Sequence, residues 1–330
     1  MAEDSETLAR AVAEGDRRAL ARAVTLVEST RADHRARAVA LLEALRAMAP
    51  REALRIGLSG TPGVGKSTFI EAFGLMLTEA GLKVAVLAVD PSSARSGGSI
   101  LGDKTRMDRL ARTPSAFIRP SPSSAALGGV ARRTREAVAL VEAAGFDVVL
   151  VETVGVGQSE TMVAEMTDLF VLLIGPGGGD ELQGVKRGIM EMADLILVNK
   201  SDGDLAAAAR RTCADYSGAL RLLRRRPQDP EGFPKALAVS ALSGAGLAQA
   251  WAEMQALAEW RRAEGHWAAS RARQAERWFE AEVRAGLLAR LAREPVRSAM
   301  ATLGADVAAG RRTPESAAAE MLARLGAAAE

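Results

Sequence analysis

The sequence predicts an α/β fold in which a mainly parallel sheet is extended by a helical region at each end. Between residues 51 and 265, nearly continuous Val, Ile and Leu runs alternate with helical patterns, which is typical of parallel strands covered by helices on both faces. Residues 1–50 and 266–330 show only the helical period. We therefore expect an N-terminal helical region (1–50), a sheet domain (51–265) and a C-terminal helical region (266–330).

The N-terminal region is expected to be helical throughout, and Pro50 ends it. Two apolar faces mark this region, one at Leu8, Val12, Leu20, Val24 and Val27 and the other at Val39, Leu42, Leu45 and Met48.

Seven apolar runs are expected to form the strands of the sheet. They span residues 55–59, 83–89, 115–119, 147–151, 168–174, 194–198 and 235–239. Helical patterns such as 129–144 and 205–223 separate most of them. In a sheet of this kind the ligand lies beyond the carboxyl ends of the strands, where the loops emerge.

The C-terminal region is rich in alanine and arginine and yet carries large aromatic residues. The aromatics of this region and of the segment before it are Trp251, Trp260, Trp267, Trp278 and Phe279. Large apolar side chains on otherwise solvated helices indicate packing or a subunit contact. That they simply cover the sheet domain is an equally good interpretation.

Composition excludes several classes of protein. The 330 residues are 48% hydrophobic and carry a net charge of only +2, which gives no argument for a nucleic-acid or membrane partner. Cys213 is the single cysteine, so an intrachain disulfide is impossible and a reducing compartment is expected. The N-terminus lacks the apolar core of a secretory signal. We expect a cytoplasmic protein.

A glycine-rich loop after the first strand predicts a bound nucleoside triphosphate. Its residues are Gly60, Thr61, Pro62, Gly63, Val64, Gly65, Lys66, Ser67 and Thr68, and a helical pattern follows. Glycines allow backbone N–H groups to surround the phosphates, and the helix N-terminus adds a favourable dipole. Lys66 is expected to reach the β- and γ-phosphates, and the Ser67 hydroxyl to bind Mg²⁺.

A second motif predicts which base is bound. Asn199, Lys200 and Asp202 directly follow the strand at 194–198. A carboxylate in the base plane can accept two hydrogen bonds from guanine, whereas adenine would leave it unpaired at a cost of about 1–3 kcal/mol or more. Asn199 is expected at the N7/O6 edge and the Lys200 stem over the ring. Ser240, Ala241 and Leu242 end another strand, where a backbone N–H can contact guanine O6. The pattern favours GTP over ATP.

Three carboxylates are expected near the triphosphate. Asp90 and Glu152 follow apolar strands, and Asp103 lies in a glycine-containing loop. Magnesium prefers oxygen ligands and retains several waters, so these groups would hold it together with Ser67, mainly through the water shell. Gly155 follows in the segment 152–158, and its N–H can bind the γ-phosphate.

Several of these segments occur together in one order and carry a resemblance. They are the loop 60–67, Val89-Asp90-Pro91-Ser92-Ser93, residues 96–107, residues 152–160, residues 175–183 and Asn199-Lys200-Ser201-Asp202. In this combination the chain closely resembles the methylmalonyl-CoA mutase-associated GTPases, the MeaB or ArgK-like family. Residues 96–107 and 152–160 are the most specific of these segments, whereas many NTPases share the phosphate loop.

The resemblance implies a P-loop GTPase domain with N- and C-terminal helical extensions. It implies a chaperone that binds GTP or GDP with Mg²⁺ and gates cofactor delivery to an adenosylcobalamin-dependent methylmalonyl-CoA mutase and removal of inactive cofactor. It also implies a homodimer formed through the C-terminal helices, and switch loops at 90–108, 154–166 and 175–186. With the resemblance, Lys66, Asp103, Glu152 and Lys186 are the expected catalytic residues.

Three alternatives belong to the same structural class. A nickel-chaperone GTPase needs clustered soft or borderline ligands, and this chain offers only Cys213, His34 and His266. A small-molecule kinase is disfavoured by the guanine-reading motif. A signal-recognition-type GTPase would bring a methionine-rich or RNA-binding module, whereas the tail has only scattered methionines.

Overall fold

The computed structural model describes residues 2–48, 51–89, 107–120, 127–153, 159–177, 187–224 and 226–327. By their contacts the residues fall into two compact units, Met1–Gln274 and Ala275–Glu330. The first unit contains the sheet and the N-terminal helices, and the second contains the C-terminal helices. The division at 50 and 265 stays a prediction.

All seven predicted strands are present, and their ends differ from the predicted ones by at most two residues. They are β1 (Leu54–Gly60), β2 (Val84–Val89), β3 (Ala116–Arg119), β4 (Val148–Thr153), β5 (Leu169–Ile174), β6 (Leu195–Val198) and β7 (Lys235–Ala238). Every residue of β1, β2, β4, β5 and β6 is buried, as expected for strands covered on both faces. One placement was wrong, because Glu152 lies within β4 and does not follow it.

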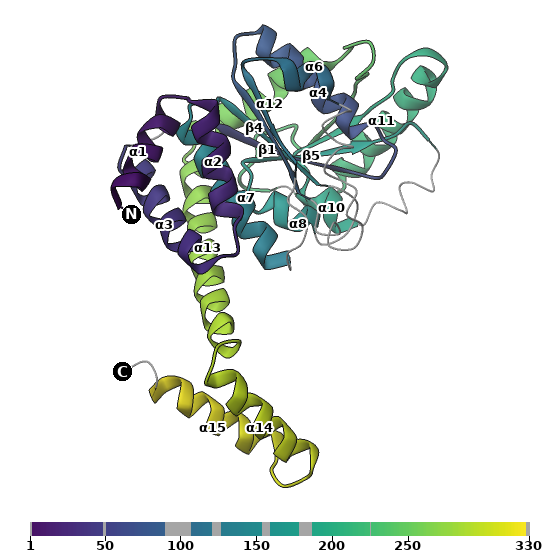
Figure 1. Ribbon diagram of the computed structural model, residues 1–330. Helices are drawn as coiled ribbons and strands as arrows, with labels where there is room; N and C mark the ends of the chain where they lie inside the picture. The colour runs from purple at the N-terminus through teal and green to yellow at the C-terminus, as the bar shows by residue number, and fades with distance from the viewer. Residues whose placement is uncertain are drawn as a thin grey trace. The chain divides into compact units, whose positions relative to one another are not determined.

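The described strands form a seven-stranded sheet in the order β3-β2-β4-β1-β5-β6-β7, and every neighbouring pair is parallel. Figure 1 shows β1 between β4 and β5 at the centre of the sheet. Consequently the loops that leave β1 and β4 emerge side by side at the carboxyl edge, where a ligand of such a sheet binds.

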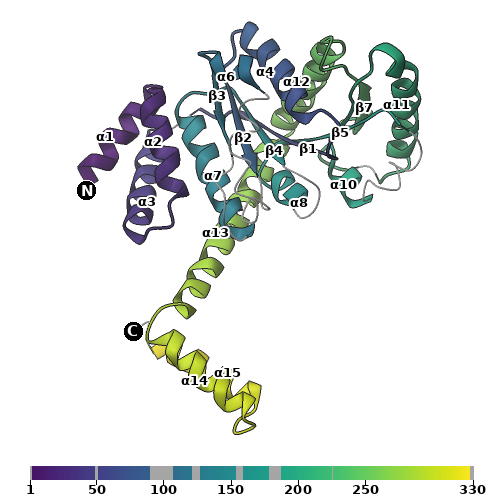
Figure 2. The same ribbon diagram turned by 45° about the vertical axis from the view of Figure 1, so that its right-hand side comes forward.

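Helices cover both faces of the sheet. Both ribbon views place α4 (Lys66–Glu79), α6 (Asp108–Arg112) and α12 (Leu247–Ala263) on one face, and α7 (Leu127–Ala143), α8 (Ser159–Ala164) and α10 (Arg187–Met192) on the other (Figures 1 and 2). The 3-10 turn Gly203–Leu205 leads into α11 (Ala206–Arg221), which packs against β6 and β7. Phe69, Phe73 and Leu77 of α4 are fully buried in the main core.

The N-terminal region consists of three helices rather than one continuous helical segment. They are α1 (Ala2–Ala13), α2 (Arg17–Glu28) and α3 (Ala32–Ala47). Gly15 adopts a positive φ of 83°, and the Asp16 carboxylate accepts hydrogen bonds from the backbone N–H groups of Arg18 and Ala19 to begin α2. Helices α2 and α3 pack against α7, so this layer attaches to one side of the sheet domain (Figure 2).

Aspartates organise the amino edge of the sheet, opposite the loops of the carboxyl edge. Asp147, Asp168 and Asp194 directly precede β4, β5 and β6. Their carboxylates accept hydrogen bonds from the backbone N–H groups of Lys83 (2.8 Å), Arg55 (2.9 Å) and Phe170 (2.7 Å), respectively. Each aspartate thus links the start of its own strand to the segment that begins a neighbouring strand.

Buried arginines tie helices α12 and α13 (His266–Leu291) to this edge. Arg261 donates to Asp194 at 2.6 Å and to Asp229 at 2.6 Å, and Arg271 donates to Asp168 at 2.8 Å. Burial lowers the pKa of Arg261, but Asp194 and Asp229 outweigh burial and raise that pKa above its ordinary value. These ion pairs hold the beginning of α13 against the sheet.

The aromatic residues of this region divide between the two interpretations. Trp267 is 6% exposed, packs in the main core and has the guanidinium groups of Arg262 and Arg271 over its ring. It therefore covers the sheet domain. Phe279, in the second unit, is 69% exposed.

The second unit has a small core of its own. Helices α14 (Val296–Ala308) and α15 (Pro314–Ala327) bring together Leu303, Ala317 and Met321, each of which is buried. Among the described residues, every helix is too short or too polar to cross a bilayer.

We predict that Asp194→Ala lowers the free energy of unfolding by about 3–5 kcal/mol, because it leaves Arg226 and Arg261 without a shared buried carboxylate. A urea titration followed by circular dichroism measures this loss. The control is Glu6→Ala, which breaks an ion pair whose side chains are more than half exposed and should change stability by no more than about 0.5 kcal/mol. Similar values for the two variants would contradict the structural role of Asp194.

Candidate functional site

The loop between β1 and α4 has two positions at which only glycine fits. A Cβ on Gly60 would lie 2.3 Å from the carbonyl oxygen of Leu173 on β5. Gly65 caps α4 with a φ of 90°, and a Cβ there would lie 2.9 Å from Asn199 Nδ2. Because neither space admits a side chain, the backbone can pass close to its neighbours. The loop therefore fits a phosphate-binding cradle that opens into a helix N-terminus.

Lys66 begins α4 and turns back across this loop. Its Nζ donates a hydrogen bond of 2.6 Å to Gly60 O and lies 3.4 Å from Thr61 O. The ammonium group is thus held beside the backbone that would surround a triphosphate. Ser67 is half-buried in the first turn of α4, whereas Thr68 is exposed.

Asn199, at the end of β6, joins two loops with one side chain. Its Nδ2 donates to Val64 O of the phosphate loop at 3.0 Å, and its Oδ1 accepts from Ala241 N at 3.0 Å. The side chain is 1% exposed. These bonds use one of its two N–H donors, so one donor is left for the base edge. The motif indicated a base contact for Asn199 but gave no signal of this bridge.

Lys200 and Asp202 complete the predicted base-binding loop. Lys200 has a positive φ of 57°, and its Nζ donates to Gly63 O at 2.8 Å. The Ser240 hydroxyl donates to Asp202 Oδ1 at 2.5 Å, which leaves the other carboxylate oxygen available to a ligand. The structure thus brings the predicted base-binding residues next to the predicted phosphate loop.

The backbone N–H groups of residues 240–242 differ in whether they are already hydrogen-bonded within the protein. Ser240 N donates to Ala245 O, and Ala241 N donates to Asn199. Leu242 is 82% exposed. Among the described residues its amide makes no hydrogen bond, so it is a candidate donor to guanine O6 beside Ala241.

Glu152 and Thr153 end β4 directly beside β1. Glu152 pairs in register with Leu58 and is 4% exposed. The Thr153 hydroxyl, which is fully buried, donates to the Ser59 hydroxyl at 3.0 Å. This hydroxyl pair joins the residue before Gly60 to the residue after Glu152. Sequence reasoning missed it, because a buried serine and threonine carry no motif of their own.

Four predicted site residues lie outside the described residues, namely Asp90, Asp103, Gly155 and Lys186. Two of the four expected magnesium ligands are among them, and Ser67 and Glu152 remain. Within the described part of the chain, no group of three or more His, Cys, Asp or Glu side chains is arranged to hold a metal ion.

Comparisons with known proteins identify the family of the chain. A family model described as "Methylmalonyl Co-A mutase-associated GTPase MeaB" matches residues 20–296. A "Putative GTPase" of Caulobacter vibrioides is 57% identical over 281 residues, which are 85% of this chain and 85% of that protein. The "Methylmalonic aciduria type A homolog, mitochondrial" of Mus musculus is 49% identical over 314 residues, 92% of this chain and 75% of that protein.

A solved structure has a similar fold over nearly the whole chain. The crystal structure titled "LAO/AO transport system kinase" superposes with a TM-score of 0.74 at 38% identity, and the match covers 98% of this chain and 97% of that one. The α/β fold with a parallel sheet, predicted from the alternation of strands and helices, is confirmed.

We predict that Asp202→Asn shifts nucleotide preference from GTP toward XTP by about tenfold or more, or about 1.4 kcal/mol. The substitution replaces one acceptor with a donor where guanine presents donors. Competitive titration of the two nucleotides measures the shift. Asp204→Asn, at an exposed position of the adjoining 3-10 turn, is the matched control. Unchanged GTP affinity in Asp202→Asn would refute the base assignment.

We predict that Lys66→Ala lowers the turnover of GTP by about 10²-fold or more, because it removes the charge that stabilises negative charge on the phosphates in the transition state. Asp103→Ala and Glu152→Ala should keep some nucleotide binding and lose Mg²⁺-dependent rate. A phosphate-release assay measures each rate. Lys83→Ala, an exposed lysine before β2, serves as control. Wild-type turnover in all three site variants would place the reaction elsewhere.

Proposed function

The chain belongs to the methylmalonyl-CoA mutase-associated GTPase family, and from this premise we propose that it is a GTP-hydrolysing chaperone of an adenosylcobalamin-dependent methylmalonyl-CoA mutase. In this role it gates delivery of the cofactor and removal of inactive cofactor. The observation that supports the proposal most directly is the bridge from Asn199 to Val64 and Ala241. That bridge joins the loop that we propose reads guanine to the loop that we propose binds the triphosphate.

The described residues supply most of what GTP binding requires. Backbone N–H groups of 60–67 would surround the phosphates, and Lys66 would pair with the β- and γ-phosphates. Asp202 would accept from guanine, and the Lys200 stem would lie along the base. Mg²⁺, held through the Ser67 hydroxyl and the carboxylates of Asp90, Asp103 and Glu152, would neutralise charge on the triphosphate. We further propose that Gly155 donates its N–H to the γ-phosphate.

The mutase partner is inferred from the family and from the name of the mouse relative. That name refers to methylmalonic aciduria, and the family name refers to association with the mutase. We propose a cytoplasmic location for this chain, with neither a nucleic acid nor a membrane as partner.

We also propose a homodimer that forms through the C-terminal helices. On α13, Phe279, Val283 and Leu287 are 69%, 45% and 55% exposed and lie four residues apart, so they form one apolar face. Exposed apolar faces of this kind mark contact surfaces. A monomeric mass in sedimentation equilibrium would contradict the dimer.

A small-molecule kinase is the second candidate, since the solved structure with 38% identity carries a kinase title. It predicts phosphate transfer to an acceptor, whereas the chaperone predicts release of free phosphate. A nickel-chaperone GTPase finds no support among the described residues, where no suitable ligand cluster occurs.

A pull-down from cell extract with a non-hydrolysable GTP analogue tests the main proposal. The bait is the full chain, and Asp202→Asn is the control because it should lose guanine recognition. Recovery of a cobalamin-dependent mutase with the wild-type bait supports the proposal. Its absence, together with phosphorylation of a small-molecule acceptor by the chain, would favour the kinase.

We predict that Lys186→Ala keeps the slow intrinsic GTPase rate and loses most of the mutase-stimulated rate. Lys186 follows a glycine-rich segment, 175–179, whose ordering costs backbone entropy that a partner can supply. We propose that the partner brings this lysine to the β,γ-bridging oxygen, as an arginine finger is delivered. Phosphate release measured with and without mutase tests this. Equal loss of both rates would mean that Lys186 belongs to the active site of the protein without its partner. Loss of neither rate would mean that Lys186 is a surface residue with no part in hydrolysis.

A further inference from the structure

A buried arginine on α7 lacks the counter-charge that such a residue requires. Arg133 is 7% exposed, and it lies on the buried stripe of α7 that also contains Val130, Thr134 and Ala137. Within the described residues it makes no hydrogen bond or ion pair, and its Nε is buried without a partner. A charge that is buried and uncompensated is strongly unfavourable in a protein interior.

The neighbouring buried charges show that this situation is exceptional. On the same helix, Glu136 pairs with Arg35 of α3, and Glu142 pairs with Arg55 of β1 at 2.7 Å. At the same cavity, Arg119 at the end of β3 pairs with Glu28 at the end of α2. Each of these charges has a partner among the described residues, whereas Arg133 has none there. A ligand from outside the chain could supply the missing negative charge.

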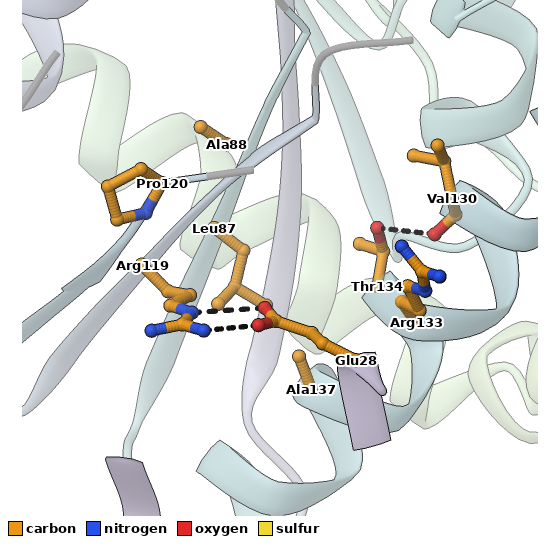
Figure 3. Close-up of a pocket in the computed structure, with 9 residues that line it drawn as sticks. All are labelled: Glu28, Leu87, Ala88, Arg119, Pro120, Val130, Arg133, Thr134 and Ala137. Carbon is orange, nitrogen blue, oxygen red and sulfur yellow. Dashed lines mark hydrogen bonds and ion pairs between the residues drawn. The ribbon is translucent and has the colours of Figure 1, made fainter. Parts of the chain in front are cut away.

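Arg133 lines a cavity that suits a small anion. The cavity lies between the ends of β2 and β3, the end of α2 and the early turns of α7, and Leu87 and Ala88 of β2 form part of its wall. In Figure 3 the guanidinium group of Arg119 lies against the Glu28 carboxylate, and that of Arg133 lies beside Thr134 on α7, on the other side of Glu28 in this view. The cavity holds about 20 Å³ of room for water, which is enough for about one water molecule or one oxygen of an oxyanion.

The electrostatics of the cavity favour a negative ligand. Two guanidinium groups and one carboxylate line it, so it has a net positive charge. The Glu28 carboxylate already occupies Arg119, which leaves the fork of Arg133 as the open donor.

We propose that Arg133, supported by Arg119, forms an oxyanion-binding site for a carboxylate or phosphate group. A guanidinium fork can donate two parallel hydrogen bonds to such a group, which matches both charge and geometry. The site lies at the ends of β2 and β3, away from the phosphate loop that follows β1. Among the residues that line it are none of those proposed to bind GTP or Mg²⁺.

Isothermal titration of the full chain with inorganic phosphate and with acetate tests the site, with ionic strength held constant by chloride. We expect Arg133→Gln to weaken oxyanion binding by roughly tenfold or more, because it removes the charge-assisted contact. Arg210→Gln, an exposed arginine on α11, should leave binding unchanged. Phosphate bound in the phosphate loop is the same in all variants and cancels in the comparison.

A second variant is expected to change oxyanion affinity in the opposite direction. Glu28→Gln removes the competing carboxylate and frees Arg119, so it should tighten oxyanion binding, whereas damage to the fold would weaken binding in both variants. Stronger binding of acetate identifies a carboxylate ligand, and stronger binding of phosphate identifies a phosphate ligand. The proposal is overturned if neither anion binds, if Arg133→Gln binds as the wild type does, or if Glu28→Gln binds more weakly.

Discussion

The hydrogen bonds of the Asn199 side chain are the constraint on which the candidate site depends. One amide group, almost completely buried, contacts the loop after β1 through Val64 and the loop after β7 through Ala241. A side chain at position 65 would collide with that amide, which lies where a Cβ would project, so glycine fits this position. Lys200 adds a second bond to the same loop. The group proposed to read a base and the backbone proposed to hold phosphates are therefore fixed relative to one another, which is what recognition of one particular nucleotide requires.

The two edges of the sheet use charged residues in opposite ways. At the amino edge, Asp168 and Asp194 are buried, accept backbone N–H groups and pair with arginines from α12 and α13. Their carboxylate oxygens are bonded to groups of the protein itself, so these aspartates stabilise the fold. At the carboxyl edge, Asp202 has one described bond to Ser240 and stays half-buried. A carboxylate at the loop edge that still has a free acceptor oxygen can bind a ligand. A carboxylate whose oxygens are all bonded within the protein can only stabilise the strands.

The sequence predicted the strands well because a buried parallel strand must be apolar along its whole length. It places the candidate phosphate loop and the candidate base loop at strand ends because each motif has a fixed spacing tied to one strand end, and their binding roles stay predictions. It failed where the outcome depends on tertiary contacts. The break at Gly15 and Asp16 lies in a segment with helical composition, and Glu152 extends β4 because its neighbours β1 and β2 continue beside it. The bridge made by Asn199 required knowledge of which loops meet, which no local pattern contains.

Arg133 shows most clearly why burial cannot be read from such patterns. It lies in Ala131-Arg132-Arg133-Thr134-Arg135-Glu136, a run that indicates a solvated helix face. Yet Thr134 and Glu136 are also buried, because α2 and α3 pack against α7 from outside the sheet layer. That added layer converts a polar surface into an interior, where each charge requires a partner. Glu136 obtains one from α3. Arg133 has no such partner among the described residues, and it borders the cavity that remains between the layers. The cavity and the guanidinium group together therefore support one proposal.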